Sequence, residues 1–178
     1  KEVGLIIDSK DIVLTSDELN TYSDEEIENT IENTVCTFDK IETVSAATYI
    51  LPGWTQLSWN TKADGKGTEY ALGASVKNLT STNGDEIELF AIYEPNEYVV
   101  TYNGNQPPRA STTVTGSVDS TTHTYDVESS LNQAQKFVLE GYTQKGWNTR
   151  ADGTGRSFAM NAKVIDVVTE GTTVLYAE

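Results

Sequence analysis

Residues 53–65 read G-W-T-Q-L-S-W-N-T-K-A-D-G, and residues 141–153 read G-Y-T-Q-K-G-W-N-T-R-A-D-G. The second stretch follows the first at an offset of 88 positions without a gap, and 13 of 27 positions are identical between 53–79 and 141–167. An internal repeat at a fixed offset indicates two copies of one structural unit. Tandem copies suit binding, spacing and display better than they suit a single catalytic site.

The repeat extends in both directions and divides the chain into unit 1, residues 1–95, and unit 2, residues 96–178. Near the end of each unit, Leu89-Phe-Ala91 matches Leu175-Tyr-Ala177. Pro95 argues against a strand or helix that continues through the junction. Units of about 85 residues bury only a modest core.

The composition excludes several classes of function. A formal charge of -15 disfavours nucleic acids, heparin-like glycans and anionic membranes as partners, because their phosphates and sulfates require clusters of Lys and Arg. The sequence has no stretch of about 18 apolar residues, so no segment of it is expected to span a membrane. The single cysteine, Cys36, allows neither an internal disulfide nor a thiolate metal cluster. Neither a signal peptide nor a sorting motif is visible, and both ends look like cuts from a longer protein.

The local patterns predict a mixed α+β unit. Residues 97–102, 141–148 and 172–177 are rich in β-branched and aromatic residues, which is typical of strands. Residues 128–136 carry a possible serine N-cap and predict a short helix across the sheet. Unit 1 also contains an acidic insert, residues 16–34, whose Ser23 and Glu26 form a capping box that predicts a second helix.

The repeated phrase resembles the Listeria–Bacteroides repeat, the B-repeat class of internalins and other bacterial surface proteins. The resemblance rests on the Trp-Asn-Thr-basic-Ala-Asp-Gly runs at 59–65 and 147–153, and on the closing Leu-aromatic-Ala in both units. The usual Tyr-Ala-x-Trp ending is kept only in part, at Phe90–Tyr93 and Tyr176–Glu178. The resemblance implies two tandem small β-grasp-like (ubiquitin-like) units, each a mixed sheet with one helix. It also implies a location outside the cell or on its surface, and no catalysis.

The signature loop of each copy has two interpretations. Its oxygen-bearing side chains could bind calcium, but each loop supplies only one Asp and one Asn next to a basic residue, whereas calcium sites gather several carboxylates and carbonyls. The preferred interpretation is a tight hairpin turn with Asn capping the backbone, Asp-Gly turning the chain and the last glycine at positive φ. The repeat signature comprises Trp59, Asn60, Asp64, Gly65, Gly67, Trp147, Asn148, Asp152, Gly153 and Gly155.

The aromatic residues raise the question of ligand binding. Trp59 and Trp147 occupy the same position in both copies, which favours a core role. Trp54, replaced by Tyr142 in unit 2, is the better candidate for exposure, and Tyr49 could extend the same surface. These three residues define the alternative function, a carbohydrate-binding module that stacks sugars on exposed aromatic rings.

An enzyme is not expected. His123 is the only histidine, and it is interpreted as a strand-surface residue, because a catalytic triad needs geometry that nothing here supports. No catalytic, metal or cofactor residues are assigned, and a Lys–Asn isopeptide crosslink is not expected because a buried, unpaired lysine is costly. The sequence therefore predicts a non-catalytic structural spacer and adhesion or protein-interaction module. Its partner would be a protein or a host or cell-surface ligand.

Overall fold

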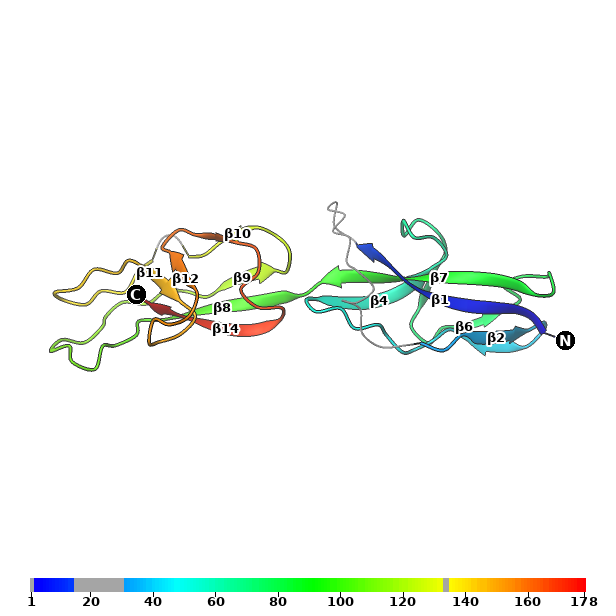
Figure 1. The fold of residues 1–178 in the computed structure, drawn as a ribbon, viewed down its shortest axis with the longest axis horizontal. Coiled ribbons are helices and arrows are strands. Elements are labelled where there is room, and N and C mark those ends of the chain that lie inside the picture. The colour runs from blue at the N-terminus through cyan, green and yellow to red at the C-terminus, as the bar shows by residue number, and fades with distance from the viewer. Residues whose placement is uncertain (1, 15–30, 133–134) are drawn as a thin grey trace. The chain divides into compact units, whose positions relative to one another are not determined.

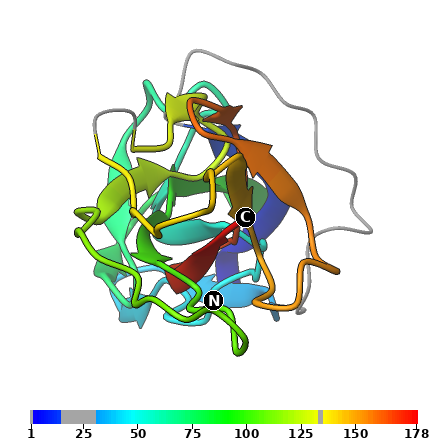
Figure 2. The ribbon, with the colours of Figure 1, turned by 90° about the vertical axis from the view of Figure 1, so that its left-hand side faces the viewer.

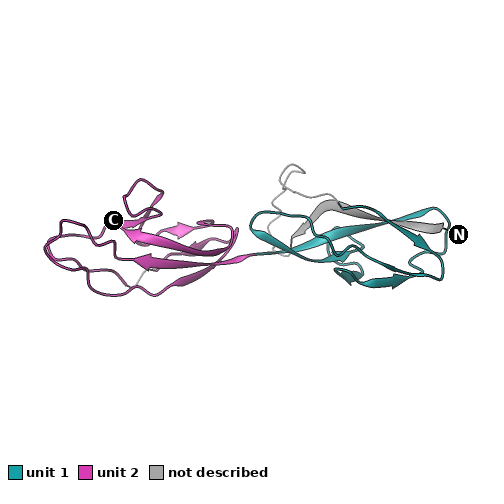
Figure 3. Cartoon of the chain, turned by 90° about the horizontal axis from the view of Figure 1, so that it is seen from below, with its two compact units in different colours: residues 1–95 teal, residues 96–178 magenta. Residues whose placement is uncertain are grey.

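A computed structural model describes residues 2–14, 31–132 and 135–178 of the chain. By internal contacts the chain divides into two compact units, 1–95 and 96–178 (Figure 3). Most of the acidic insert of unit 1, and with it the predicted capping box, lies outside the described residues. Each unit is described separately below.

Unit 1 is built on a five-stranded sheet with the order β2-β1-β7-β4-β5 (Figure 1). The first and last strands of the unit, β1 and β7, are parallel neighbours, and the other pairs are antiparallel. A second, two-stranded sheet joins β3 to β6. The strands of unit 1 are β1 (Glu2–Leu14), β2 (Thr34–Thr37), β3 (Ile41–Thr43), β4 (Trp54–Asn60), β5 (Glu69–Ala71), β6 (Ser75–Lys77) and β7 (Asp85–Pro95).

Unit 2 repeats this arrangement strand for strand. Its main sheet has the order β12-β11-β14-β8-β9, so β8 and β14 correspond to β1 and β7 and are again parallel neighbours. A two-stranded sheet joins β10 to β13, as β3 joins β6 in unit 1. The strands of unit 2 are β8 (Glu97–Asn103), β9 (Thr121–Thr124), β10 (Ser129–Ser130), β11 (Gly146–Asn148), β12 (Ser157–Ala159), β13 (Lys163–Val164) and β14 (Gly171–Ala177).

The core of unit 2 lies against the face of the sheet that carries Trp147. Alternation in β8 directs Tyr98 and Val100 to this face, and Leu175 of β14 joins them. Leu131 and Val164 cover the cluster, and all five side chains are at most 2% exposed. Burying a side chain of this size stabilises the fold by about 1.5–3 kcal/mol, so these few residues supply much of the driving force for a unit this small.

The predicted α+β class is wrong, because the described residues form strands and turns and include no helix. The described residues of the predicted helix in unit 2, 128–132 and 135–136, show why. Ser129 and Ser130 pair with β13, and the Asn132 side chain accepts a hydrogen bond from the backbone N–H of Gln135. Side-chain bonds of this kind give the backbone an alternative to helix formation. The β-grasp class with one helix per unit is therefore replaced by an all-β description of these residues.

Candidate ligand-contact surface

The signature loop of each unit is organised by a buried asparagine. Asn60 Oδ1 accepts hydrogen bonds from the backbone N–H groups of Lys62 (3.0 Å) and Gly67 (2.9 Å), and its Nδ2 donates to the carbonyl of Gly65 (3.0 Å). Asn148 makes the same set of contacts in unit 2, to Arg150, Gly155 and Gly153. Both side chains are at most 2% exposed. The asparagine thus satisfies the backbone of its own turn.

Asn148 makes further contacts in unit 2. Its Nδ2 also lies within hydrogen-bond distance of Glu178 Oε1 (2.7 Å) and Ser157 Oγ (3.0 Å). Ser157 Oγ in turn donates to the same carboxylate oxygen. The turn of unit 2 is therefore tied to the end of β14.

The two glycines of each loop have different structural roles. Gly65 and Gly153 adopt positive φ, at 68° and 75°, which favours glycine. Gly67 and Gly155 are not among the positive-φ residues, so the predicted reason for them is wrong. A Cβ at Gly67 would lie 2.6 Å from Asn60 Oδ1, and one at Gly155 would lie 2.7 Å from Asn148 Oδ1. These glycines make room for the asparagine.

The aspartates of the loops act as turn caps. Asp64 Oδ1 accepts the backbone N–H of Lys66, and Asp152 Oδ1 accepts both the N–H and the hydroxyl of Thr154. These bonds from Thr154 lower the pKa of Asp152. In the part of the chain that the structure describes, no group of three or more His, Cys, Asp or Glu side chains could hold a metal ion. The loops have the chemistry of turns.

Two of the three predicted aromatic contact residues are buried, and one is exposed. Trp59 and Trp147 are fully buried. Trp54, expected to be exposed, is only 5% exposed, and Tyr49 is 4% exposed with its ring edge against Trp59. Of the three predicted ligand-contact residues, only Tyr142 is open to solvent, at 59%. The expectation for Trp54 is therefore wrong, and the two units do not present the same aromatic surface.

Tyr142 lines a groove of about 90 Å³ in unit 2. The groove is lined by residues of the loops 104–114 and 139–144, and its wall is completed by the end of β14. Figure 2 shows the course of these two loops at one end of unit 2. Gly104 lets Val114 and Phe137 pack close to the backbone, because a Cβ there would lie 2.5 Å from Val114 Cγ1 and 3.1 Å from the Phe137 ring. The lining residues are Gly104, Asn105, Pro107, Val114, Phe137, Leu139, Tyr142, Thr143, Gln144, Ala177 and Glu178.

Apart from Tyr142, none of the groove residues was among the predicted ligand contacts. The repeat could have pointed to two of them, because Phe137 and Leu139 align with Tyr49 and Leu51 at the offset of 88 and Tyr49 was a predicted ligand contact.

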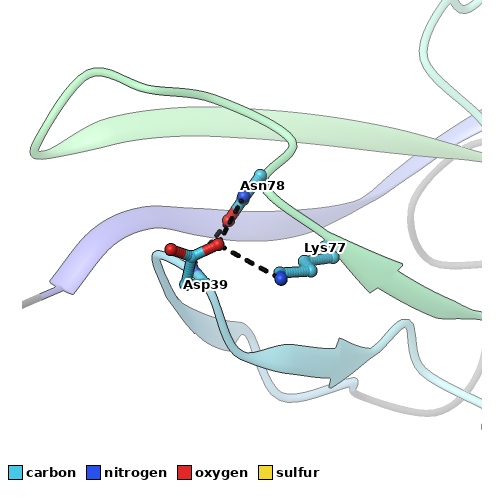
Figure 4. A network of polar contacts seen from close by, with 3 residues as sticks. All are labelled: Asp39, Lys77 and Asn78. Atoms are coloured by element: carbon cyan, nitrogen blue, oxygen red, sulfur yellow. Dashed lines mark hydrogen bonds and ion pairs between the residues drawn. The ribbon is translucent and has the colours of Figure 1, made fainter.

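In unit 1 an exposed polar cluster joins the turn between β2 and β3 to the end of β6 (Figure 4). Asp39, at φ 66°, donates its backbone N–H to Asn78 Oδ1 (2.7 Å), and its carboxylate receives Asn78 Nδ2 (3.2 Å) and Lys77 Nζ (3.1 Å). The hydrogen bond from Asn78 and the nearby Lys77 lower the pKa of Asp39. Exposed ion pairs add little stability, so this cluster mainly fixes the turn.

His123 is buried, at 2% exposure, and the prediction of a surface histidine is wrong. Its ring is stacked on Tyr98 with centroids 5.2 Å apart. Its two ring nitrogens lie 2.7 Å from Thr121 Oγ1 and 2.5 Å from Ser129 Oγ. Burial lowers its pKa. With hydroxyls as its hydrogen-bond partners and an aromatic ring beside it, this histidine is a packed core residue.

Comparison with known proteins finds a family to which unit 2 is similar. Residues 98–178 match the family model of the Listeria-Bacteroides repeat domain. The chain is also 30% identical over 103 residues to a protein of Evansella cellulosilytica described as a Gly-rich membrane protein. That similarity covers 58% of this chain and 11% of the relative, so the chain spans only a small part of the relative's length. No solved structure matches the chain significantly.

Unit 2 is therefore similar to the Listeria-Bacteroides repeat domain, a non-catalytic type of module. Within the residues that the structure describes, no helix is long and apolar enough to cross a membrane.

Proposed function

We propose that the chain is a tandem spacer and protein-interaction module of a bacterial surface or secreted protein, with unit 1 as a second, more divergent copy of the repeat. The family match of unit 2 supports this proposal, and so does the similarity to a Gly-rich membrane protein. The repeated phrase and the common strand order support the assignment of unit 1.

The observation that carries the spacer role is the parallel pairing of the first and last strands of each unit. In unit 2, β8 and β14 are paired from Gly171↔Tyr98 to Tyr176↔Asn103. Tension applied at the two ends of such a unit pulls the parallel strands in opposite directions along their length. All the hydrogen bonds of the ladder then bear the load together instead of opening one after another. A unit built in this way resists extension.

Force spectroscopy on single molecules tests the spacer role. In a Cys36→Ser background, handles at Glu97→Cys and at the C-terminus load β8 and β14 in shear. Handles at Glu97→Cys and Glu170→Cys pull the same two strands apart from one edge. We expect a clearly higher unfolding force in the first geometry. Equal forces in the two geometries would contradict the spacer proposal.

The surface location has its own test. Brief protease treatment of intact cells of the source bacterium, followed by mass spectrometry, should release peptides from 31–178. Recovery of these peptides only after lysis would contradict the proposed location.

A further inference from the structure

The loop between β6 and β7 contains an Asn-Gly pair, Asn83-Gly84, and the sequence has one other such pair, Asn103-Gly104 in unit 2. Where glycine follows asparagine, the backbone nitrogen of the glycine can approach the side-chain amide carbon closely, because glycine has no Cβ to obstruct it. The two pairs therefore have the same intrinsic chemistry. The fold places them in different surroundings.

Asn83-Gly84 lies in an open turn. Both residues are exposed, and Gly84 adopts φ 84°. A Cβ at Gly84 would meet no atom within 4 Å, so nothing packs against this side of the turn. The pairing of β7 with β1 begins at the next residue, Asp85. The side-chain hydrogen bonds of this loop join Thr80 to Thr82 and to Asp85, and within the described residues the Asn83 side chain takes part in none.

Asn103-Gly104 is held in place on all sides. Asn103 belongs to the ladder between β8 and β14, and its Oδ1 accepts the backbone N–H of Asn105 (2.8 Å). Gly104 is crowded by the side chains of Val114 and Phe137, as described above. A reaction between these two residues first requires the local structure to open.

Unit 2 has a carboxylate where unit 1 has Asn83. A glycine at positive φ stands where the last strand of each unit starts, Gly84 just before β7 and Gly171 as the first residue of β14. The residue before this glycine is Asn83 in unit 1 and Glu170 in unit 2. The second unit thus shows that a negative charge at this point is compatible with the fold.

We propose that Asn83 is a site of spontaneous deamidation, in which Asn83 and Gly84 react with each other and then with water. The backbone nitrogen of Gly84 loses its proton and bonds to Cγ of Asn83, while the side-chain Nδ2 takes up a proton and leaves as ammonia. The product is a five-membered succinimide ring. Because the reacting groups belong to neighbouring residues, the ring closes without a binding step.

Water then opens the ring in one of two ways. Attack at Cγ breaks the newly formed Cγ–N bond and gives aspartate at position 83. Attack at the backbone carbonyl carbon breaks the original peptide bond and gives iso-aspartate, in which the chain continues through the side chain. Both products have exchanged –NH2 for –OH, with no change of oxidation state, and carry a new negative charge beside Asp85 and Glu86. Since β7 pairs with β1 only from Asp85 onwards, the sheet should tolerate either product.

This chemistry goes beyond the proposed function and does not depend on it. The charge of unit 1 would change with the age of the molecule whether or not the chain acts as a spacer. A failure of the test below would leave the force measurements intact, and the reverse also holds.

The test incubates the chain of residues 1–178 in mildly alkaline buffer made with H₂¹⁸O, followed by digestion with pepsin and mass spectrometry with fragmentation. We expect a mass gain of about 3 Da at Asn83, about 1 Da from the exchange of –NH2 for –OH and about 2 Da from the heavy oxygen. Two products should separate by chromatography, and one should co-elute with the peptide of Asn83→Asp. The rate at Asn83 should exceed that at Asn103 at least about tenfold, the factor that an opening step of about 1.4 kcal/mol imposes. No gain at Asn83, or equal rates at the two sites, would overturn the proposal.

Two controls separate the structure from the sequence. In the urea-unfolded chain the rates at Asn83 and Asn103 should become similar, because both are Asn-Gly pairs. A preference for Asn83 that persists there would overturn the structural explanation. Gly84→Ala should slow the reaction at Asn83, because its Cβ lies beside the attacking nitrogen. Gly171→Ala is the matched control, since Gly171 shares the positive φ and the open surroundings, and it should leave the rate at Asn83 unchanged. An unchanged rate in Gly84→Ala would contradict the ring closure.

Discussion

The segments 49–56 and 137–144 have nearly the same backbone arrangement and opposite surroundings. In unit 1 the continuation of β7 covers the segment, and Trp54 is buried. In unit 2 the equivalent Tyr142 is open to solvent beside a groove. The comparison teaches that similar sequences set similar local turns, whereas the exposure of a side chain in them depends on which other segments pack against it. The predictions below test this difference and the features that the two units share.

The largest expected contrast is between Trp54→Ala and Tyr142→Ala. Removing the buried Trp54 ring should lower the free energy of unfolding of unit 1 by about 3–5 kcal/mol. Removing the exposed Tyr142 ring should change that of unit 2 by no more than about 0.5 kcal/mol. Urea denaturation followed by NMR, which resolves the two units, measures both. Similar losses at the two positions would mean that the segments are covered alike.

The next effect concerns the asparagines that organise the signature loops. Asn60→Ala and Asn148→Ala should each cost about 3 kcal/mol, because several buried backbone groups lose their partner at once. Substitution of the same two asparagines by aspartate should distinguish the two loops. Asn148→Asp should cost more than Asn60→Asp, because it places a carboxylate where Nδ2 now meets Glu178 at 2.7 Å. The same denaturation experiment gives the order, and a smaller loss for Asn148→Asp would contradict it.

A smaller effect separates the two glycines of each loop. Gly155→Ala should cost about 2–3 kcal/mol, because the new Cβ collides with the asparagine that holds the turn. Gly153→Ala should cost only about 1–2 kcal/mol, because its Cβ meets no atom within 4 Å and only the positive φ is strained. Gly67→Ala and Gly65→Ala are the matched pair in unit 1. Thermal denaturation can rank all four variants, and the reverse order within either pair would refute the account of these turns.

The smallest predicted effect is on the pH dependence of unit 2. Burial lowers the pKa of His123 in the folded state, so the unfolded chain binds a proton more readily. The stability of unit 2 should therefore be complete above the unfolded pKa of about 6.5 and should fall as the pH drops towards the folded value. His123 is the only histidine, which makes His123→Asn a clean control that should remove the step. Unfolding by urea at pH 7.5 and pH 5.5 measures it, and a stability that rises on acidification would contradict the burial.

Two strands and two core tryptophans can be predicted from the sequence, because the patterns that indicate them are local. The strand at 97–102 is predicted from its β-branched and aromatic residues and corresponds to β8. The strand at 172–177 corresponds in the same way to β14. The repeat also places Trp59 and Trp147 in equivalent positions, and both rings are fully buried.

The remaining features depend on contacts that no local pattern contains. In place of the helix expected at 128–136, the described residues of this range make side-chain hydrogen bonds and pair with β13, more than thirty residues away. The buried Trp54 lies opposite Pro95, a neighbour that is set by the register of β7 on β4. The role of Gly67 depends on an asparagine side chain that folds back over the turn. The register between distant strands and the folding back of a side chain depend on tertiary contacts, so they cannot be predicted from the local sequence.

Hydrogen exchange measured by mass spectrometry tests the central comparison most directly. Peptides that cover 49–56 and 137–144 are compared in the chain of residues 1–178. The account predicts slow exchange for 49–56, whose side chains are buried, and faster exchange for 137–144, where Tyr142 is exposed. Equal protection of the two segments would contradict it.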